Sequence, residues 1–225
     1  ILLRGEFLLI SFLSFFYLYI FYRINIKKIL LIICLTILVI SPYLIRNIIS
    51  LNTISITKTY GYNLWKGNNS NSDVSGSEII SNENLQIKKN NISKNKFYEK
   101  NLDKIFLNEA ISNIKNDPIR YLNLSIKKFF SFIFIDVSSS YPNYYNPFHY
   151  LPVLIIGIMS IFGIVLSLKK KYPINFLIVY FFVYVCIFSI FFILPRYKLA
   201  ILPFQIIFTN ILIQEILKKF HFKNE

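Results

Sequence analysis

The stretch that decides the fold runs from Ser41 to Asn69 and reads SPYLIRNIISLNTISITKTYGYNLWKGNN. It starts at the end of an apolar run, passes Pro42 and Arg46, and then becomes polar, aromatic and glycine-bearing. A helix that leaves a lipid bilayer has this order, because proline weakens its last turn and arginine prefers the headgroup level. The stretch therefore predicts that a membrane helix ends here and that an extramembrane segment begins.

Aromatic side chains follow this predicted exit, at Tyr60, Tyr62 and Trp65. Amphipathic rings are enriched at the membrane–water interface, so an aromatic belt is the simplest interpretation. A binding surface is the alternative, because Asn63 and Gly67 add hydrogen-bonding capacity and close approach that an anchor does not need.

The whole chain is apolar in long blocks: its 225 residues are 55% hydrophobic, with a mean hydropathy of +0.51. A helix needs about 20 apolar residues to cross a bilayer, and several blocks approach this length. We predict an all-α polytopic integral membrane protein with about five transmembrane helices and an outer-face segment that carries amphipathic helices. The blocks without Asp, Glu, Lys or Arg are residues 7–22, 29–45, 148–168, 172–195 and 199–214.

The net charge of +14 follows the ends of these blocks, a pattern of membrane orientation rather than of nucleic-acid binding. Basic residues gather on one predicted side, which the positive-inside rule makes cytoplasmic. The chain then divides into two transmembrane helices (1–49), an outer segment (50–147), three transmembrane helices (148–217) and a cytoplasmic tail (218–225). The cytoplasmic group is Arg23, Lys27, Lys28, Lys169, Lys170, Lys171, Lys218, Lys219 and Lys223; Arg196 and Lys198 fall on the outer side.

Within the outer segment, residues 68–96 are polar and without periodicity, which predicts a loop or partial disorder. Apolar residues then recur every fourth position, which predicts a helix over 97–116. Asp117–Pro118 ends it and provides the N-cap and first residue of the next helix. That helix, over 118–135, is too short in its uncharged part to cross and is expected to lie at the interface. The stripe of the earlier helix is Leu102, Phe106, Ala110 and Ile114.

Motifs of soluble enzymes are missing from the sequence: there is no phosphate-binding glycine-rich loop, metal-ligand spacing or nucleophile elbow. His149 and His221 lie too far apart to suggest a metal pair, and His149 is interpreted as an interfacial side chain. Cys34 and Cys186 lie inside apolar blocks and are expected to be buried thiols. No cofactor is identified, and dependence on a divalent metal stays open.

Three short motifs resemble a known family. The first is Pro42-x-x-x-Arg46-Asn47 followed by Gly61-Tyr62-Asn63-Leu64-Trp65-x-Gly67-Asn68-Asn69. The second is Asn116-Asp117-Pro118-x-Arg120-Tyr121, and the third is Arg196-Tyr197-Lys198-Leu199-x-x-x-Pro203-Phe204. In this order they resemble segments of bacterial membrane glycosyltransferases of the GT-C fold, the relatives of protein mannosyltransferases and lipid A aminoarabinose transferases.

The resemblance implies an enzyme of the bacterial inner membrane that moves a sugar from a polyprenyl-phosphate donor to an envelope glycan, lipid or protein. Membrane lipids are then partners and nucleic acid is not. In that family the catalytic base lies in the first outer loop, which would stand upstream of Ile1. Since Met159 is the single methionine, we expect a C-terminal fragment that is inactive alone, and no catalytic residue is named.

Cations and aromatic side chains on the outer face are the candidate substrate-binding residues. Guanidinium and ammonium groups bind phosphate, although the same groups also snorkel to lipid headgroups. Two other functions stay open: a polysaccharide polymerase or ligase, and a non-enzymatic transporter of lipid-linked saccharides, which would be expected to show internal repeats. The candidate residues are Arg46, Tyr60, Tyr62, Asn63, Trp65, Asn68, Arg196, Tyr197 and Lys198.

Overall fold

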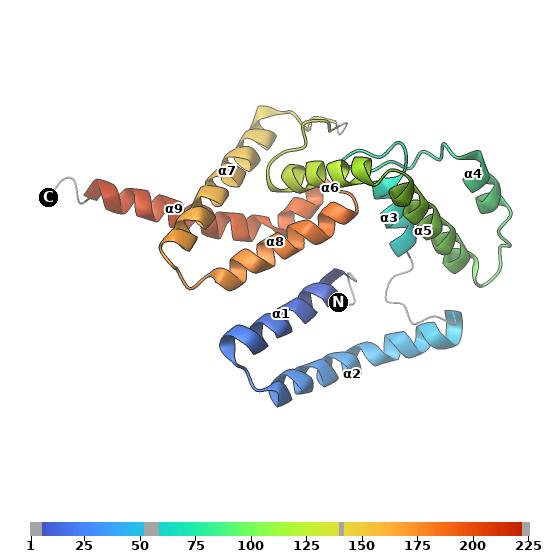
Figure 1. Ribbon diagram of the computed structural model, residues 1–225, viewed down its shortest axis with the longest axis horizontal. Coiled ribbons are helices and arrows are strands. Elements are labelled where there is room, and N and C mark those ends of the chain that lie inside the picture. The colour runs from blue at the N-terminus through green and yellow to red at the C-terminus, as the bar shows by residue number, and fades with distance from the viewer. Residues whose placement is uncertain (1–5, 52–58, 140–141, 222–225) are drawn as a thin grey trace. The chain divides into compact units, whose positions relative to one another are not determined.

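A computed structural model describes most of the chain, and every regular element in the described part is a helix (Figure 1). The chain divides into two compact units. The described residues are 6–51, 59–139 and 142–221. Unit 1 consists of Ile1–Ser70 and Glu78–Asn116, and unit 2 consists of Asn71–Ser77 and Asp117–Glu225.

Unit 1 begins with the predicted pair of apolar helices, α1 (Glu6–Tyr22) and α2 (Ile26–Leu51). The helix α2 continues through Pro42 for more than two further turns and ends at Leu51, close to the predicted boundary at residue 49. Proline has no N–H for the carbonyl four residues earlier, Leu38. The hydroxyl of Ser41 donates to that carbonyl instead, at 2.8 Å, so the carbonyl keeps a hydrogen-bond donor.

The rest of unit 1 contains α3 (Tyr60–Asn68), α4 (Glu83–Asn90) and α5 (Tyr98–Asn116). The helix predicted over 97–116 is confirmed as α5, and Phe106 and Ala110 of its stripe are buried. The prediction that 68–96 lacks regular structure was wrong, because α4 lies inside it. Asn82 caps α4 by accepting from the N–H groups of the second and third helical residues, and Leu85 anchors it at 2% exposure.

Unit 2 contains the remaining helices, and in Figure 1 α7 packs on α9 while α6 lies beside α8. The predicted cap is confirmed: the Asp117 carboxylate accepts from the N–H of Arg120 at 3.1 Å, and α6 begins at Pro118. The block 172–195 is not one helix, since α8 ends at Ile190. The elements are α6 (Pro118–Ile133), α7 (Pro147–Lys169), α8 (Asn175–Ile190), the 3₁₀ helix η1 (Pro195–Ala200) and α9 (Leu202–His221).

Small residues let α7 and α9 approach closely. Gly163 lies against the backbone of α9, where a Cβ atom would stand 2.0 Å from the carbonyl oxygen of Phe208. The hydroxyls of Ser160 and Ser167 are buried and return to carbonyls of their own helix. Such residues favour helix association where lipid removes the hydrophobic drive between helices.

Near their C-terminal ends, α7 and α9 are joined by polar groups around Glu215, whose side chain is 7% exposed. Lys170 forms an ion pair with this carboxylate, the Tyr172 hydroxyl donates to it at 2.5 Å, and Lys218 lies 3.1 Å from it. This network holds part of the predicted cytoplasmic lysine group. The predicted tail continues as helix to His221, and residues 222–225 lie outside the described part.

The short segment Asn71–Ser77 belongs to unit 2 although the chain around it belongs to unit 1. Val74 is 1% exposed, and its carbonyl accepts from the N–H of Ile193 at 2.9 Å. The buried side chain of Val74 and this backbone hydrogen bond therefore help to order a segment whose composition predicted a loop.

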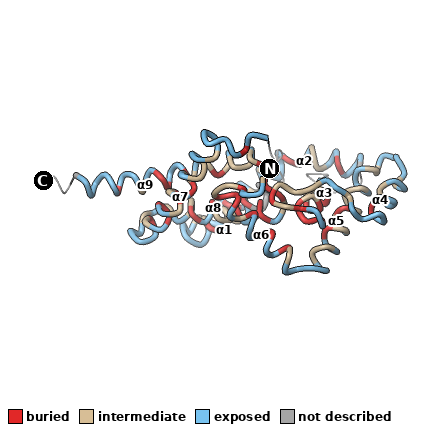
Figure 2. The backbone as a smooth tube through the Cα atoms, turned by 90° about the horizontal axis from the view of Figure 1, so that it is seen from above, coloured by how far each residue is buried: buried red, intermediate tan, exposed pale blue. Residues whose placement is uncertain are grey.

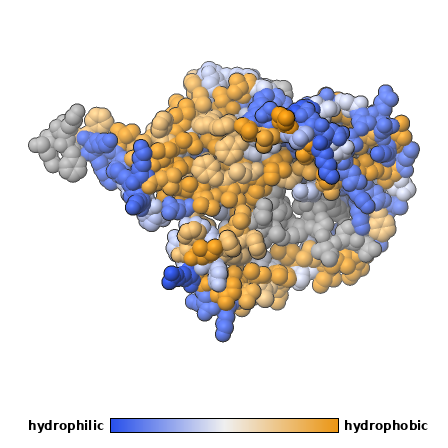
Figure 3. Space-filling model, in the orientation of Figure 1, coloured by the Kyte–Doolittle hydropathy of each residue, from blue (hydrophilic) through white to orange (hydrophobic). Residues whose placement is uncertain are grey.

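Two described helices are long and apolar enough to cross a membrane, over Ile26–Ser50 and Pro147–Lys169. Only 11% and 28% of their most apolar windows are buried, unlike the core helix of a soluble protein. Most described residues of α2 are exposed, which Figure 2 marks in pale blue, and hydrophobic residues gather over α7 and α8 in Figure 3. The apolar stretches Ile10–Tyr22 and Asn175–Ile190 are shorter, so five spans remain a prediction.

The two cysteines are exposed, contrary to the expectation that they are buried. Cys34 lies on α2 and Cys186 on α8. An apolar block does not show which side of its helix packs against protein. On α2 and α8, the side that carries the cysteine is exposed.

Candidate functional site

The predicted aromatic segment forms α3, and its buried face lies against α5. Trp65 is 2% exposed, and its ring centroid is 4.6 Å from that of Phe106 and 5.9 Å from that of Tyr62. Tyr62 also meets Phe106 edge-on at 5.2 Å. Trp65 is therefore a core residue of unit 1 and not a member of a lipid-facing belt.

The other candidates on α3 differ in exposure. Tyr60 is 51% exposed, and Asn63 is partly exposed with its amide 3.5 Å from the hydroxyl of Thr59. Asn68 is buried, and its amide donates to the carbonyl of Leu64 at 2.8 Å. Asn68 therefore supports its own helix from a buried position, while Tyr60 is exposed and Asn63 is partly exposed.

The start of α3 is fixed by Asp103 of α5. The Asp103 carboxylate accepts from the N–H of Gly61 at 3.0 Å and from that of Tyr62 at 2.8 Å. A Cβ on Gly61 would stand 2.2 Å from the Asp103 carbonyl, so glycine is required for this approach. The carboxylate satisfies two N–H groups that a helix leaves without intrahelical partners.

The three candidates of the third motif lie in η1 and have three different environments. Arg196 is exposed, with its guanidinium 5.6 Å from the ring of Tyr197. Tyr197 packs on Phe188 and Phe192, at 5.5 Å and 6.0 Å between ring centroids. Lys198 is mostly buried. Arg46 lies apart from these residues in the sequence, exposed on α2 in unit 1.

Two lysines of unit 2 bind the carbonyl ends of helices. Lys128 of α6 is 0% exposed and donates to the carbonyl of Phe191, the C-cap of α8, at 2.5 Å. Lys198 donates to the carbonyl of Phe134, the C-cap of α6. Helix C-termini carry partial negative charge and carbonyls without intrahelical partners, so each ammonium stabilises one of them.

Burial makes both ammonium groups weaker bases than an exposed lysine. It lowers the pKa of Lys128 to about 7 and that of Lys198 to about 8, although the nearby carboxylates of Asp73 and Asp136, respectively, act in the opposite direction. Near neutral pH both lysines therefore lie close to the point where they gain or lose a proton.

Lys198 lines both of two neighbouring cavities in unit 2. The larger, of about 110 Å³, is mostly apolar. The smaller, of about 10 Å³, is lined by Asp136 and serine hydroxyls. Arg196 and Tyr197 are not among the residues that line either cavity. The polar and aromatic residues of the larger cavity are Tyr144, His149, Tyr150, Lys198 and Gln205.

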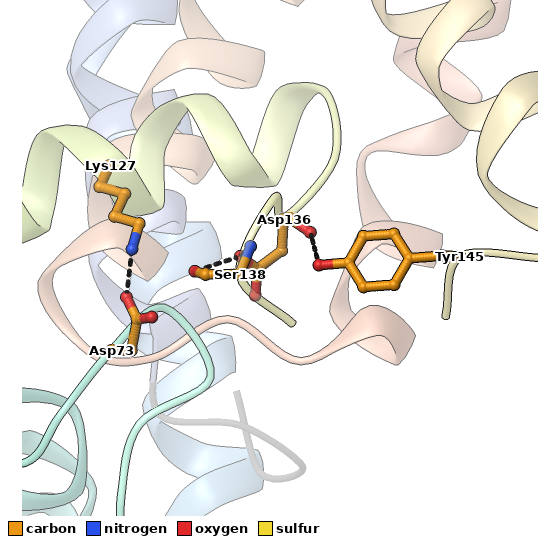
Figure 4. A network of polar contacts seen from close by, with 5 residues as sticks. All are labelled: Asp73, Lys127, Asp136, Ser138 and Tyr145. Carbon is orange, nitrogen blue, oxygen red and sulfur yellow. Dashed lines mark hydrogen bonds and ion pairs between the residues drawn. The ribbon is translucent and has the colours of Figure 1, made fainter. Parts of the chain in front are cut away.

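Figure 4 shows the polar contacts beside the smaller cavity. Asp136 accepts from the N–H and the hydroxyl of Ser138, at 3.0 Å and 3.1 Å, and its carbonyl accepts from the hydroxyl of Tyr145 at 3.3 Å. Lys127 lies 2.7 Å from Asp73 in an ion pair that is about half exposed. Partial burial would raise the pKa of Asp73, but hydrogen bonds with Lys127, Ser138 and the N–H of Val74 outweigh it and lower the pKa.

Sequence reasoning missed most of the larger cavity. His149, interpreted as an interfacial side chain, is exposed near the start of α7 and also lines this cavity, edge-on to Tyr144 at 5.8 Å. One pattern could have revealed Lys128. It falls on the same face of α6 as Tyr121 and Leu124, at helical spacing, and all three are buried. Asp136, Tyr144 and Gln205 have no such pattern, because distant segments bring them together.

In the part of the chain that the structure describes, no group of three or more His, Cys, Asp or Glu side chains could hold a metal ion. No family model, curated protein or solved structure matches this chain.

The buried Lys128 is expected to make stability rise with pH. An unfolded lysine titrates near pH 10, so between about pH 7 and pH 10 the unfolded state holds more protons than the folded state. The free energy of unfolding then increases across this window, through a contribution on the order of a few kcal/mol. Lys128→Met should flatten the increase, measured by denaturant unfolding in detergent at several pH values.

The matched control is Lys127→Met, the exposed neighbour on the same helix, which should leave the pH slope unchanged. Lys198 contributes in the same direction, so the slope of the Lys128 variant should shrink and not vanish. If the free energy of unfolding rose equally with pH in wild type and in Lys128→Met, the expected contribution of Lys128 would be refuted.

Proposed function

We propose that this chain is part of a polytopic glycosyltransferase of the bacterial inner membrane. It would take a sugar from a polyprenyl-phosphate donor at the outer face and deliver it to an envelope glycan, lipid or protein. The observation that carries the proposal is the cavity around Lys198, together with the motif resemblance at Arg196–Phe204.

The cavity suits the part of such a donor where lipid, phosphate and sugar meet. It combines apolar walls with Tyr144, His149, Gln205 and the ammonium of Lys198. It also includes Tyr150 and Val153 from the start of α7, a helix that is able to cross a membrane. Its volume is about 110 Å³, below the roughly 300 Å³ at the lower end for small-molecule sites. We therefore assign it to the phosphate and its neighbouring atoms.

Transfer breaks the bond between the anomeric carbon of the sugar and the phosphate oxygen, and forms a bond from that carbon to an acceptor oxygen. The electron pair stays on the phosphate, and the acceptor proton passes to a base. Cations placed at the developing phosphate charge stabilise the transition state. Lys198 in the cavity and the exposed Arg196 on the same 3₁₀ turn are proposed for this role. No residue described here is assigned as the base.

The proposed topology has five spans over the uncharged blocks, with 50–147 outside and the C-terminus in the cytoplasm. The helix α6 would lie at the interface, since its 16 residues are too few to cross. This arrangement puts the lysine group around Lys170 inside and η1 outside, in agreement with the positive-inside rule. In unit 1, Arg46, Tyr60, Tyr62 and Asn63 keep their predicted role as contacts for a sugar or an acceptor.

An assay of sugar transfer tests this proposal. Purified protein that contains this chain together with its catalytic base is given a synthetic polyprenyl-phosphate sugar and envelope acceptor. Release of polyprenyl phosphate with sugar incorporated into the acceptor would support the proposal. Movement of the intact lipid-linked sugar across a vesicle, without release, would instead support the transporter.

A further inference from the structure

A third cavity, of about 240 Å³, lies in unit 1 and is more polar than the cavity of Lys198. Its walls come from the end of α3, from α5 and from the start of α4. Asn69, Asn82 and Asn113 contribute amides and Glu109 contributes a carboxylate, while Leu85 and Ile79 provide apolar surface.

We propose that this cavity binds one ring of a neutral saccharide. Amide and carboxylate groups offer paired donors and acceptors, which match the neighbouring hydroxyls of a sugar. No lysine or arginine is among the residues that line the cavity, so it lacks the cations that a sugar phosphate would need. The aliphatic groups of Leu85 and Ile79 can cover the C–H face of a ring.

Two of these polar groups, Asn82 and Glu109, are held in place before a ligand arrives. The amide of Asn82 donates to Glu109 at 2.7 Å, and the same side chain caps α4 with its oxygen. Such fixing lowers the entropic cost of binding, since fewer side chains must be ordered. The volume is below the roughly 300–1,000 Å³ of sites for drug-sized ligands, which limits the occupant to about one ring.

This inference goes beyond the proposed transfer reaction and does not depend on it. The cavity lies in unit 1, whereas the cavity of Lys198 lies in unit 2. Binding of a sugar is therefore measured directly, without turnover or lipid-linked donor.

The chain contains one tryptophan, Trp65, and this residue lines the cavity, so its fluorescence reports on this site. The whole chain in detergent is titrated with glucose, galactose, mannose, N-acetylglucosamine and glucose 1-phosphate. We expect a saturable change with at least one of the neutral sugars and weaker binding of glucose 1-phosphate than of glucose.

Two variants test the assigned contacts. Glu109→Gln keeps an oxygen for Asn82 but removes the charge, and Asn113→Ala removes an amide. Each should weaken binding about tenfold, the effect of losing a hydrogen bond with strong partners. Asn108→Ala, an exposed position next to Glu109 on α5, should bind like wild type.

Two results would overturn binding of a saccharide in this cavity. One is the absence of a saturable change with every neutral sugar at its highest soluble concentration. The other is a change that persists unweakened in both Glu109→Gln and Asn113→Ala. Tighter binding of glucose 1-phosphate than of glucose would contradict the neutral class.

Discussion

Gly163→Val is expected to lower the free energy of unfolding by about 3 kcal/mol or more. Even a single Cβ at this position would stand 2.0 Å from the carbonyl oxygen of Phe208 and 2.6 Å from its carbonyl carbon. These are backbone atoms of α9, so no side-chain rotation relieves the clash and the two helices must separate. Unfolding in detergent, followed by circular dichroism, measures the loss.

Two comparisons isolate the steric effect. Gly163→Ala should lose less, because alanine favours helix by about 1 kcal/mol over glycine and offsets part of the clash. Phe162→Leu changes the adjacent residue, which is 59% exposed, and should change stability little. Wild-type stability of Gly163→Val would refute the close packing of α7 on α9.

The second large effect is on transfer. Lys198→Met should slow transfer from a polyprenyl-phosphate sugar by about two to three decades, since one charge-assisted contact in the transition state is worth about 2–4 kcal/mol. The loss should appear mainly in kcat, because the charge on the phosphate develops in the transition state. Lys169→Met, which removes a lysine at the far end of α7, serves as the matched control.

Lys198 also holds the carbonyl end of α6, so a structural role must be separated from an electrostatic one. Lys198→Gln keeps a donor for the Phe134 carbonyl but carries no charge. If the residue acts only as a cap, glutamine should restore the rate that methionine loses. The proposal requires the glutamine variant to stay slow at wild-type stability, and full rescue would contradict it.

The helices followed from the sequence where the local pattern determined them. Uncharged blocks located α1, α2, α7 and α9, and Asp117–Pro118 marked the boundary between α5 and α6 because a carboxylate cap and a proline act on the adjacent residues. The sequence did not show that α2 passes through Pro42 as a helix, where the Ser41 hydroxyl donates to the Leu38 carbonyl that Pro42 leaves without an N–H donor.

What the sequence did not show depends on contacts between distant residues. The side chain of Trp65 has the same amphipathic character in a core as in a membrane belt, and only the ring of Phe106 decides between them. The burial of Val74 and the position of Lys128 at the end of α8 likewise depend on tertiary contacts. The cavity of Lys198 was only partly predicted: the motif pointed to that lysine, but not to Asp136, Tyr144 or Gln205.

The central claim is that the polar segment and the cavity of Lys198 face outward across a membrane, where sugars on polyprenyl carriers are used. Labelling of single cysteines in intact cells tests it most directly. Because Cys34 and Cys186 are exposed, both are first replaced by serine.

Cysteines at the exposed positions Ser93 and Ser138 probe the outer segment, and cysteines at Asn25 and Lys219 probe the opposite side. The proposed topology predicts that a membrane-impermeant thiol reagent labels positions 93 and 138 in intact cells, and positions 25 and 219 only after permeabilisation. Labelling of 93 without 138, or of 25 in intact cells, would contradict it.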